Sequence, residues 1–317
     1  MKIQCPIRKI LLPVDGSKHS KRAIYFAGYL GKSLGECLQG IDLLSVLTGR
    51  YMSRRIPYID YRSDIMKLSD SFAKFKKRHI KRDIKPALDE GEKILRDIGI
   101  ELPVKKLIVD GDPAEEIVKT ADEGHYSAII LSRRGLSGII GILVGSVTNK
   151  VVNSAIGQTV YVVGQNVQEV KKCPVSKILV PVDGSSYSLK GVEYAAFMAK
   201  ALKNYIKKIT LLRVINLAFY EKRLMTGIDL EKETKNILKE GKSVLIEAGV
   251  SNRLITTEAR IGGPAEEIIK EAEKVNYNLI IMGRKGRTAF KDFILGGVSS
   301  TVLQRCQNTT IAIVSIK

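Results

Sequence analysis

The strongest constraint on the fold of this chain is an internal duplication. Four blocks of sequence occur twice, in the same order. In the first copy they are CPIRKILLPVDGS at 5–17, DLLSVL at 42–47, GDPAEEI at 111–117 and SAIILSRRG at 127–135. In the second copy they are CPVSKILVPVDGS at 173–185, TLLRVI at 210–215, GGPAEEI at 262–268 and NLIIMGRKG at 278–286. The offset is 168 residues for the first two blocks and 151 for the last two, so the first copy has 17 extra residues between them. The chain is therefore two versions of one structural unit.

Apolar strands alternate with helices in both copies. The strands expected in the first copy are 8–14, 38–47, 104–109, 127–132 and 158–164. Those expected in the second copy are 176–182, 206–215, 254–260, 278–282 and 309–316. Long helices are predicted over about 64–98 and 229–248, with Gly99 and Gly249 at their carboxyl ends. This alternation predicts an α/β fold of two tandem, doubly wound domains, each a parallel sheet with helices on both faces.

The duplication and the length of 317 residues also predict the domain boundaries. We expect a first domain over 1–165 with a basic insertion at about 50–82, a linker within 164–176, and a second domain over 174–317. No run of 18 apolar residues occurs, and Arg8 and Lys9 interrupt the apolar start of the chain. We therefore expect a cytoplasmic protein.

Charge and cysteine content restrict the partners and the kinds of site. The chain has 52 Lys and Arg against 33 Asp and Glu, a net charge of +19, which favours anionic partners such as nucleotides, nucleic acid or a membrane surface. The four cysteines form no CxxC pair, so we predict reduced, mostly buried thiols and no zinc site. They are Cys5, Cys37, Cys173 and Cys306.

A glycine-rich loop follows the fourth strand of each copy. It reads SRRGLSGIIGILVGSVT at 132–148 and GRKGRTAFKDFILGGVSS at 283–300. The later glycines begin a helix, where free N–H groups and the helix dipole suit phosphate. Nearby hydroxyl and cationic side chains could assist, although a tight turn explains the glycines equally well. The hydroxyls are those of Ser146, Thr148, Ser299 and Ser300, and the cations are Arg133, Arg134, Arg284 and Lys285.

An acidic residue ends the first strand of each copy, Asp15 in PVDGS and Asp183 in its repeat. If the first and fourth strands are neighbours, the acid and the glycine-rich loop face one crevice at the carboxyl edge of the sheet. With these residues in view, the chain resembles a tandem universal stress protein. That family carries Gly-x2-Gly-x9-Gly-(Ser/Thr) after its fourth strand and Pro-x-Asp after its first, and the resemblance covers nearly the whole chain except about 50–82.

The resemblance implies a five-stranded sheet of order 3-2-1-4-5, pairing of the two units through their last strands, and a stress-related regulatory role. In its nucleotide-binding branch it implies ATP or AMP. The residues it assigns to the first site are Pro13, Val14, Asp15, Val46, Leu131, Ser132, Arg133, Gly135, Gly145, Ser146, Val147 and Thr148. Those of the second site are Pro181, Val182, Asp183, Val214, Met282, Gly283, Arg284, Gly286, Gly296, Gly297, Val298 and Ser299.

Each copy departs from the family pattern once. Ser132 stands where the leading glycine belongs, and Gly297 stands where Ser or Thr belongs. Because Gly297 removes a hydroxyl donor, we expect the first site to hold phosphates at least as well as the second.

Dedicated catalysis is not indicated by the sequence. GxxxxGK[ST] is absent, and no catalytic residue is predicted. Asp15 and Asp183 could hold Mg²⁺ on the phosphates; alternatively each accepts ribose hydroxyls or caps local backbone. Weak ATP hydrolysis remains an alternative, as does a partner-binding scaffold with degenerate sites.

The insertion is strongly basic, with twelve Lys and Arg against four Asp and Glu over 50–85. A helix is predicted there from the spacing of Ile65, Leu68, Phe72 and Phe75, and Pro86 could break or restart it. Three interpretations stay open: a longer helix packed on the sheet or a partner, an oligomerisation arm, or a surface for nucleic acid or anionic lipid.

Overall fold

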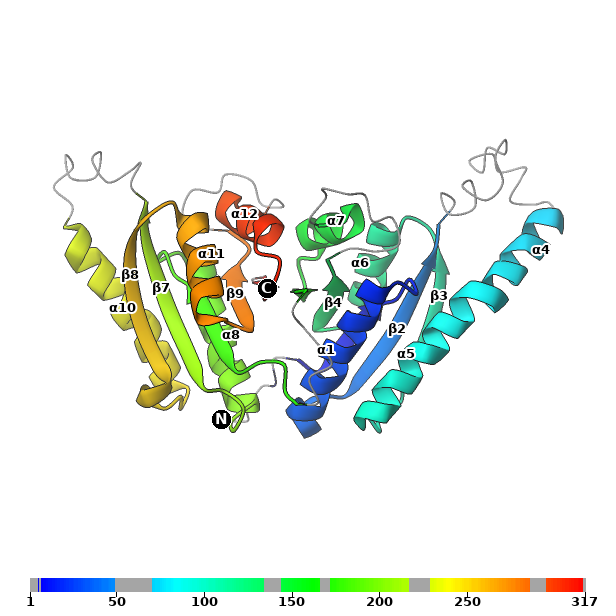
Figure 1. Cartoon of the computed structure of the whole chain (residues 1–317), viewed down its shortest axis with the longest axis horizontal. Helices are drawn as coiled ribbons and strands as arrows, with labels where there is room; N and C mark the ends of the chain where they lie inside the picture. Colours follow the sequence, from blue (N-terminus) through cyan, green and yellow to red (C-terminus); the bar gives the residue numbers. More distant parts are fainter. Residues whose placement is uncertain are drawn as a thin grey trace.

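The computed structural model describes residues 5, 7–48, 70–133, 144–165, 172–216, 229–285 and 295–315. Each copy forms five strands (Figure 1). In the first copy these are β1 (Lys9–Pro13), β2 (Gly40–Leu47), β3 (Lys106–Asp110), β4 (Ala128–Ser132) and β5 (Thr159–Val163). In the second they are β6 (Lys177–Pro181), β7 (Lys208–Asn216), β8 (Ile255–Gly262), β9 (Leu279–Gly283) and β10 (Thr310–Val314). All the predicted strands are thus present, most of them a residue or two shorter than expected.

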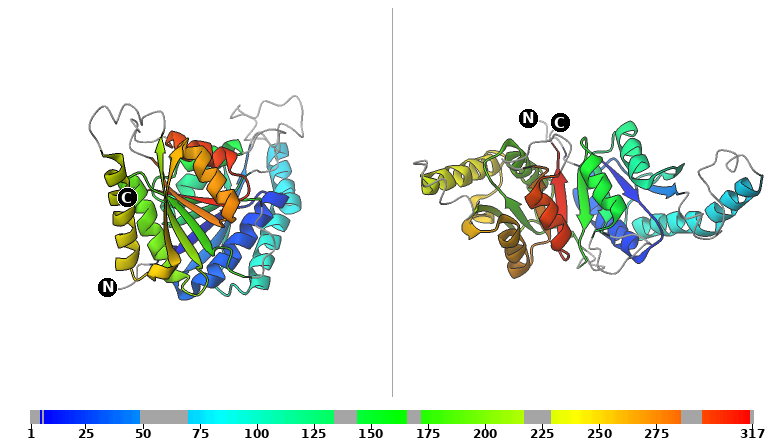
Figure 2. Two further views of the ribbon diagram at one scale, coloured as in Figure 1. Left: turned by 60° about the vertical axis from the view of Figure 1, so that its left-hand side comes forward. Right: turned by 90° about the horizontal axis from the view of Figure 1, so that it is seen from above.

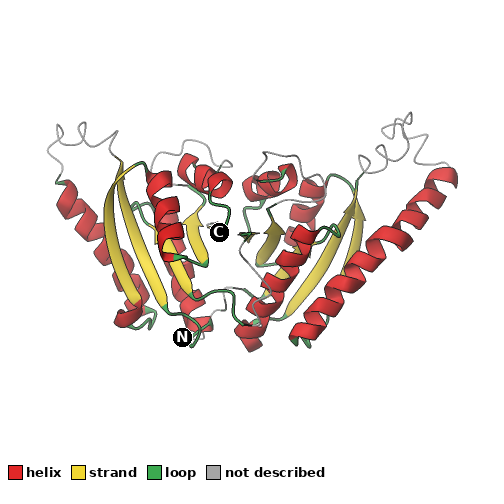
Figure 3. Ribbon diagram, in the orientation of Figure 1, coloured by secondary structure: helices red, strands yellow, loops and turns green. Residues whose placement is uncertain are grey.

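The helices alternate with the strands along the chain (Figure 3). Those of the first copy are α1 (Lys18–Leu34), α4 (Asp70–His79), α5 (Lys85–Ile98), α6 (Pro113–Glu123) and α7 (Ser146–Ser154). Those of the second are α8 (Ser186–Ala201), α10 (Leu230–Glu247), α11 (Pro264–Val275) and α12 (Gly297–Arg305). The described residues also form single turns: the 3₁₀ turns η1 (Gly35–Cys37) and η3 (Asn252–Leu254), and the π-helical turn η2 (Ile80–Ile84).

One ten-stranded sheet runs through both copies in the order β3-β2-β1-β4-β5-β10-β9-β6-β7-β8. The order 3-2-1-4-5 is therefore confirmed in each copy, and the strands within a copy are parallel. The copies meet where β5 and β10 pair antiparallel, with Ala312 opposite Tyr161 (Figure 2). The prediction that the units pair through their last strands inside one chain is confirmed.

The helices form one layer on each face of the sheet. One buried core packs α1, α5, α8 and α10 against the first face, and the other packs α6, α7, α11 and α12 against the second. Because each core includes residues of both copies, the seam between β5 and β10 is part of a continuous apolar interior.

Helix ends follow the expected capping chemistry. The side chain of Ser17 accepts a hydrogen bond from the N–H of Ser20 and so caps α1, and Ser185 caps α8 in the same way through Ser188. Gly99 ends α5 at φ 101°, a conformation that favours glycine.

The long helix of the first copy has a more complex form than predicted. Its described part begins at Asp70, and the π turn η2 separates α4 from α5. Pro86 lies in the first turn of α5, so the helix restarts there without losing a needed N–H donor. Of the proposed apolar stripe, Ile65 and Leu68 lie outside the described residues, as do the side chains of Phe72 and Phe75.

The prediction of four reduced thiols is wrong for one pair. Cys5 and Cys37 form a disulfide with a Cα–Cα distance of 5.5 Å. Cys5 precedes β1 and Cys37 ends η1 just before β2, so the pairing of these two neighbouring strands brings the sulfurs together across 32 residues of sequence. Cys173 and Cys306 are free and buried, as expected. Among the described helices, none combines the length and the apolar character that a membrane crossing requires.

Candidate functional site

The described residues of the two predicted sites lie at or next to the carboxyl edge of the sheet. In the first copy β1 has β2 on one side and β4 on the other, so the chain connections reverse direction between β1 and β4. Pro13 ends β1 and Ser132 ends β4. In the second copy Pro181 ends β6 and Gly283 ends the adjacent β9. Such a reversal point is where open parallel sheets bind ligands.

A carboxylate follows the first strand of each copy. Asp15 is exposed, and one of its oxygens accepts a hydrogen bond from the N–H of Ser17 at 3.0 Å. Asp183 does the same for Ser185 at 2.9 Å. Each acid therefore fixes the turn into the following helix while remaining at the site edge. Among the described residues there is no group of three acidic, His or Cys side chains that could hold a metal by itself.

The helices α7 and α12 begin at the same edge without a side-chain cap. Gly145 precedes α7 at φ −64° and ψ 153°, and Gly296 precedes α12 at φ −62° and ψ 153°; neither helix start has a side-chain hydrogen bond. In contrast, α1, α6, α8 and α10 are each capped by a Ser or Asp side chain, whereas α11, preceded by Gly263, is also uncapped. The first N–H groups of α7 and α12 therefore need acceptors from outside the helix.

Two hydroxyls expected to face the ligand have a structural role instead. Thr148 is 5% exposed, and its Oγ1 donates to the carbonyl of Ser132 at 2.9 Å. Ser299, at the equivalent place, is also 5% exposed and donates to the carbonyl of Gly283 at 3.0 Å. Each hydroxyl ties the first turn of a helix to the end of a strand, so it is already used as a donor inside the protein.

The cations predicted to screen phosphate charge also point elsewhere. Arg133 and Arg284 are 3% exposed, and each reaches across the seam to the last carbonyls of a helix in the other copy. Lys285 is buried too, with its ammonium 6.0 Å from the centre of the Tyr187 ring. The side chains of Arg133 and Arg284 point away from the phosphate helix because their acceptors lie in the other copy, which local sequence does not contain. Lys285 instead lies near Tyr187 of its own copy.

The departure at Ser132 has a structural explanation. A Cβ on the equivalent Gly283 would lie 2.3 Å from the carbonyl oxygen of Tyr187, at the start of α8, so only glycine fits there. In the first copy the equivalent position of α1 is His19, and a small hollow is lined by His19, Arg22 and Ser132 among others. The first copy therefore has room for the serine side chain.

Several other predicted residues contribute apolar side chains to the cores. Val14, Val182, Leu131 and Met282 are at most 5% exposed, and Val214 is 6% exposed. Val46 is only partly buried, and Val298 is 38% exposed at the start of α12. Gly135, Gly286 and Arg134 lie outside the described residues, so the glycine that follows each strand is not placed.

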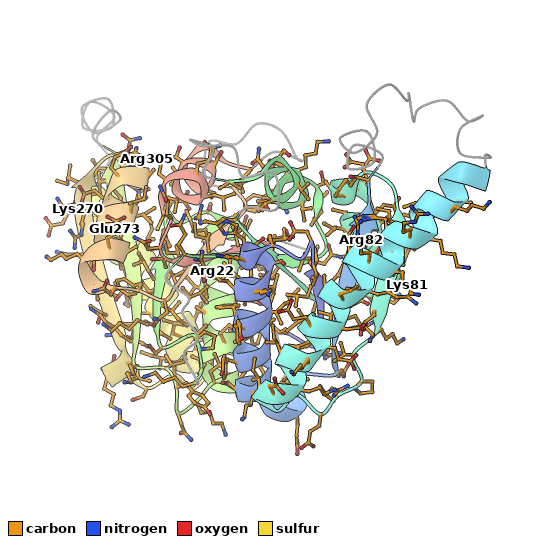
Figure 4. The ribbon with its side chains drawn as sticks, turned by 45° about the vertical axis from the view of Figure 1, so that its right-hand side comes forward. Arg22, Lys81, Arg82, Lys270, Glu273 and Arg305 are labelled. Atoms are coloured by element: carbon orange, nitrogen blue, oxygen red, sulfur yellow. A yellow bond between two sulfur atoms is a disulfide. The ribbon has the colours of Figure 1, made fainter. Side chains whose placement is uncertain are left out.

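The described part of the basic helix projects from the first copy (Figure 4). Lys76 pairs with Asp110, and Arg82 pairs with Asp83. The remaining cations of α4 and η2 have no acidic partner among the described residues; they are Lys74, Lys77, Arg78 and Lys81.

Comparison with known families agrees with this geometry. The model of the universal stress protein family matches residues 6–163 and again residues 174–313. The chain belongs to the universal stress protein family. The two matches correspond to the two copies, so this is a universal stress protein with two family units in one chain.

Similar proteins cover one copy or both. A universal stress protein of Methanocaldococcus jannaschii is 33% identical over 131 residues, covering 40% of this chain and 75% of that protein. One of Bacillus subtilis is 30% identical over 142 residues, covering 41% of this chain and 92% of that protein. The solved structure of a universal stress protein from Archaeoglobus fulgidus covers 99% of both chains with a TM-score of 0.65 at 21% identity, which shows a shared fold across both copies.

Proposed function

We propose that this universal stress protein binds an adenine nucleotide, ATP or AMP, at the carboxyl edge of each copy. The observation that carries the proposal is the pair of uncapped helix starts at Gly145 and Gly296, placed at the reversal point of each half-sheet. A helix start offers backbone N–H donors and a partial positive charge, which together suit a phosphate group. The donors in this proposal are the backbone amides that follow each glycine.

The carboxylate that follows the first strand of each copy is suited to bind the ribose of the nucleotide. Asp15 and Asp183 use one oxygen to accept a backbone N–H and stand at the end of the strand next to the phosphate helix. A carboxylate can accept hydrogen bonds from two neighbouring ribose hydroxyls. With Mg²⁺ present the same acids could instead contact metal on the phosphates.

We expect the first site to bind phosphate at least as tightly as the second. Ser146 follows the glycine in the first copy, whereas Gly297 follows it in the second. Ser146 therefore adds a hydroxyl donor at the helix start that Gly297 lacks.

The proposal is tested by placing a competing carboxylate at one helix start. Gly145 has a backbone conformation that other residues adopt readily, so Gly145→Asp can cap α7 with its own side chain. The carboxylate then occupies the amides and repels phosphate. We expect ATP or AMP binding measured by isothermal titration calorimetry to fall from two sites per chain to one, with the unfolding free energy changed by at most about 0.5 kcal/mol.

Matched variants separate the effect of the added negative charge from the effect of occupying the helix-start amides. Gly145→Asn caps the same amides without a charge, so we expect a smaller loss than with aspartate. Gly296→Asp tests the second site in the same way. Titrations with and without Mg²⁺, together with a phosphate-release assay, show whether metal or hydrolysis takes part. If the unmodified protein binds neither ATP nor AMP, the proposal is wrong.

In that case the basic helix supports a different function. Lys74, Lys77, Arg78 and Lys81 have no acidic partner among the described residues, so their positive charge is not compensated within that part of the chain. A scaffold that binds an acidic partner through this helix is the second candidate. Binding that weakens with salt and disappears on replacing these four residues by glutamine would support it.

A further inference from the structure

Two buried arginines connect each copy to the opposite one. Arg284, which follows β9, donates to the carbonyl of Val152 at 2.5 Å, to that of Asn153 at 3.0 Å, and to that of Ala155. These three carbonyls lie at the carboxyl end of α7 in the first copy.

The first copy makes the same contact in return. Arg133, which follows β4, donates to the carbonyl of Leu303 at 2.7 Å and to that of Cys306. Both carbonyls lie at the carboxyl end of α12. The offset of 151 residues relates the two arginines and also their acceptors, so the contacts are two versions of one interaction.

Each arginine is also tied to the phosphate helix of its own copy. The backbone carbonyl of Arg133 accepts the N–H of Gly145 at 2.7 Å, and that of Arg284 accepts the N–H of Gly296 at 2.9 Å. One residue therefore touches the beginning of one helix through its backbone and the end of the other through its side chain. The two helices lie on the same side of the sheet, next to the seam (Figures 1 and 2).

The buried carbonyls at the helix ends explain why an arginine is needed at each of these two positions. The last carbonyls of a helix lack intrahelical donors and carry partial negative charge, which a guanidinium satisfies with several N–H groups. Burial lowers the pKa of Arg284, because the charged form is removed from water. A polar side chain without enough donors at this place would leave buried carbonyls unpaired.

We propose that Arg133 and Arg284 are positioning residues that couple the two nucleotide sites, each holding in place the phosphate helix of the opposite copy. The inference rests on the proposed function. A nucleotide at the second site fixes the start of α12 and, through the bond between Gly296 and Arg284, the position of Arg284. Arg284 then holds α7 more firmly, so the first site loses less conformational freedom when it binds. In the same way, a nucleotide at the first site fixes Arg133, which then holds α12 more firmly for the second site.

A further contact supports this route. The N–H of Leu295, just before α12, donates to the side-chain oxygen of Asn153 at 3.1 Å. The approach to the second phosphate helix is therefore bonded directly to the end of the first one. The arginine contacts and the Leu295–Asn153 contact therefore connect the helices of the two proposed sites directly, without involving the strands of the sheet.

The coupling is tested in chains with one open site. With Gly296→Asp only the first site can bind ATP, and in this background we compare Arg284→Gln with Arg133→Gln by calorimetry. Arg284→Gln removes the hold on α7, so ATP affinity should fall about fivefold to tenfold. Arg133→Gln releases only α12, so the affinity should stay within about twofold. With Gly145→Asp, which leaves only the second site open, the order of the two effects should reverse.

If each arginine variant weakens ATP binding only at the site of the opposite copy, coupling is distinguished from a general loss of structure. A purely structural role predicts that both arginine variants weaken both sites equally, and this result would overturn the inference. A purely local role predicts that each variant weakens the site of its own copy, which would also overturn it. If the single-site parents bind ATP but none of these effects appears, the coupling fails while the proposed function stands; if the unmodified chain binds no nucleotide, the proposed function itself fails.

The chains with one open site, Gly145→Asp and Gly296→Asp, allow a second test that does not need the arginine variants. In the Gly145→Asp chain, ATP bound at the second site should slow amide hydrogen exchange in the last turn of α7, which belongs to the other copy. Unchanged exchange there at saturating ATP contradicts the coupling. Should Arg284→Gln fail to fold, Arg284→Lys replaces it, because lysine keeps the charge but cannot reach the three carbonyls with a planar fork.

Discussion

Two buried tyrosine hydroxyls form a hydrogen bond at the seam between the copies, and their protonation affects the stability of the whole protein. Tyr161 on β5 and Tyr194 on α8 come from different copies, and their hydroxyls hydrogen bond at 2.8 Å. Tyr161 is fully buried and Tyr194 is 7% exposed. Because a tyrosinate is poorly solvated in such a place, both hydroxyls stay protonated beyond the usual pH.

Alkaline pH should therefore weaken the fold through Tyr194. Burial raises the pKa of Tyr194 from 10.0 to about 12. A raised pKa means that the stabilisation is complete below pH 10.0 and is lost as the pH rises to about 12. We expect the free energy of unfolding, measured with urea across this range, to fall less steeply for Tyr194→Phe than for the unmodified chain.

Tyr194→Phe also leaves the Tyr161 hydroxyl with only a weak acceptor, the sulfur of Met198 at 3.8 Å. This should cost about 1 kcal/mol near neutral pH. Tyr205→Phe is the matched control, since Tyr205 is 44% exposed and should leave the pH profile unchanged. Parallel profiles for Tyr194→Phe and the unmodified protein would contradict the prediction.

At the scale of helices, the duplication allows equivalent helices of the two copies to be compared within one chain. Asp112 caps α6, and its side chain accepts from the N–H groups of Ala114 and Glu115. The equivalent helix α11 has Gly263 at its N-cap position and no side-chain cap. Related helices therefore start in two ways within one chain.

This difference predicts the effect of two substitutions at one position. Asp112→Ala removes the cap and should lower the free energy of unfolding by about 1 kcal/mol. Asp112→Gly reproduces the residue of the second copy and should cost only a few tenths of a kcal/mol, because glycine leaves the helix start open to water. Chemical denaturation of both variants checks the order, and a loss for Asp112→Gly as large as that for Asp112→Ala would contradict it.

The elements and the edge that holds the candidate site could be predicted from the sequence because their signals are local. Ser17, Ser185 and Gly99 act as caps through neighbours within a few residues. The positions of Asp15 and Gly145 follow from the strands that precede them and from the strand order. The π turn could not be predicted, because it changes the helix only over Ile80–Ile84 and leaves the apolar spacing of α5 intact.

What depends on distant contacts could not be predicted. The side chain of Arg133 points away from the phosphate helix because acceptors in the other copy, more than a hundred residues away, satisfy it. Thr148 has the right type and place for a ligand contact, yet its hydroxyl bonds the end of β4. The Cys5–Cys37 disulfide depends on strand pairing. A search for arginines related by the repeat offset could have drawn attention to Arg133 and Arg284, although not to their acceptors.

At the scale of the whole molecule, the seam between the copies leaves little space. A Cβ on Gly164, just after β5, would lie 2.3 Å from the backbone oxygen of Asn308. The N–H of Gly164 donates to Thr310 at 3.2 Å, and Gln165 continues the contact by donating to the carbonyl of Gln307 at 2.9 Å. The backbones of the two copies thus approach closely at this point.

Gly164→Ala should therefore strain the pairing of the copies. Since backbone rather than a flexible side chain opposes the new methyl group, we expect a loss of about 1–3 kcal/mol in unfolding free energy. Ser315 is the equivalent residue of the second copy and tolerates a side chain, so Ser315→Ala introduces no clash and is the control. It removes only the hydroxyl that accepts from Arg284 at 3.2 Å and donates to the carbonyl of Ala155 at 3.4 Å, and it should cost about 1 kcal/mol. Thermal unfolding of both variants measures the difference, and a neutral Gly164→Ala would show that the seam can adjust.

The pairing of Tyr161 with Ala312 has a consequence for how such a protein can diverge. These two residues are related by the repeat offset and face each other, so they lie on the pseudo-twofold axis. In a dimer of identical chains, that position always meets itself, and any mutation is imposed on both sides at once. Here a large aromatic residue lies opposite a small one, a combination that no symmetric dimer can encode. Joining the copies also makes their association independent of dilution and fixes their ratio, so selection can alter one half while the other keeps its task.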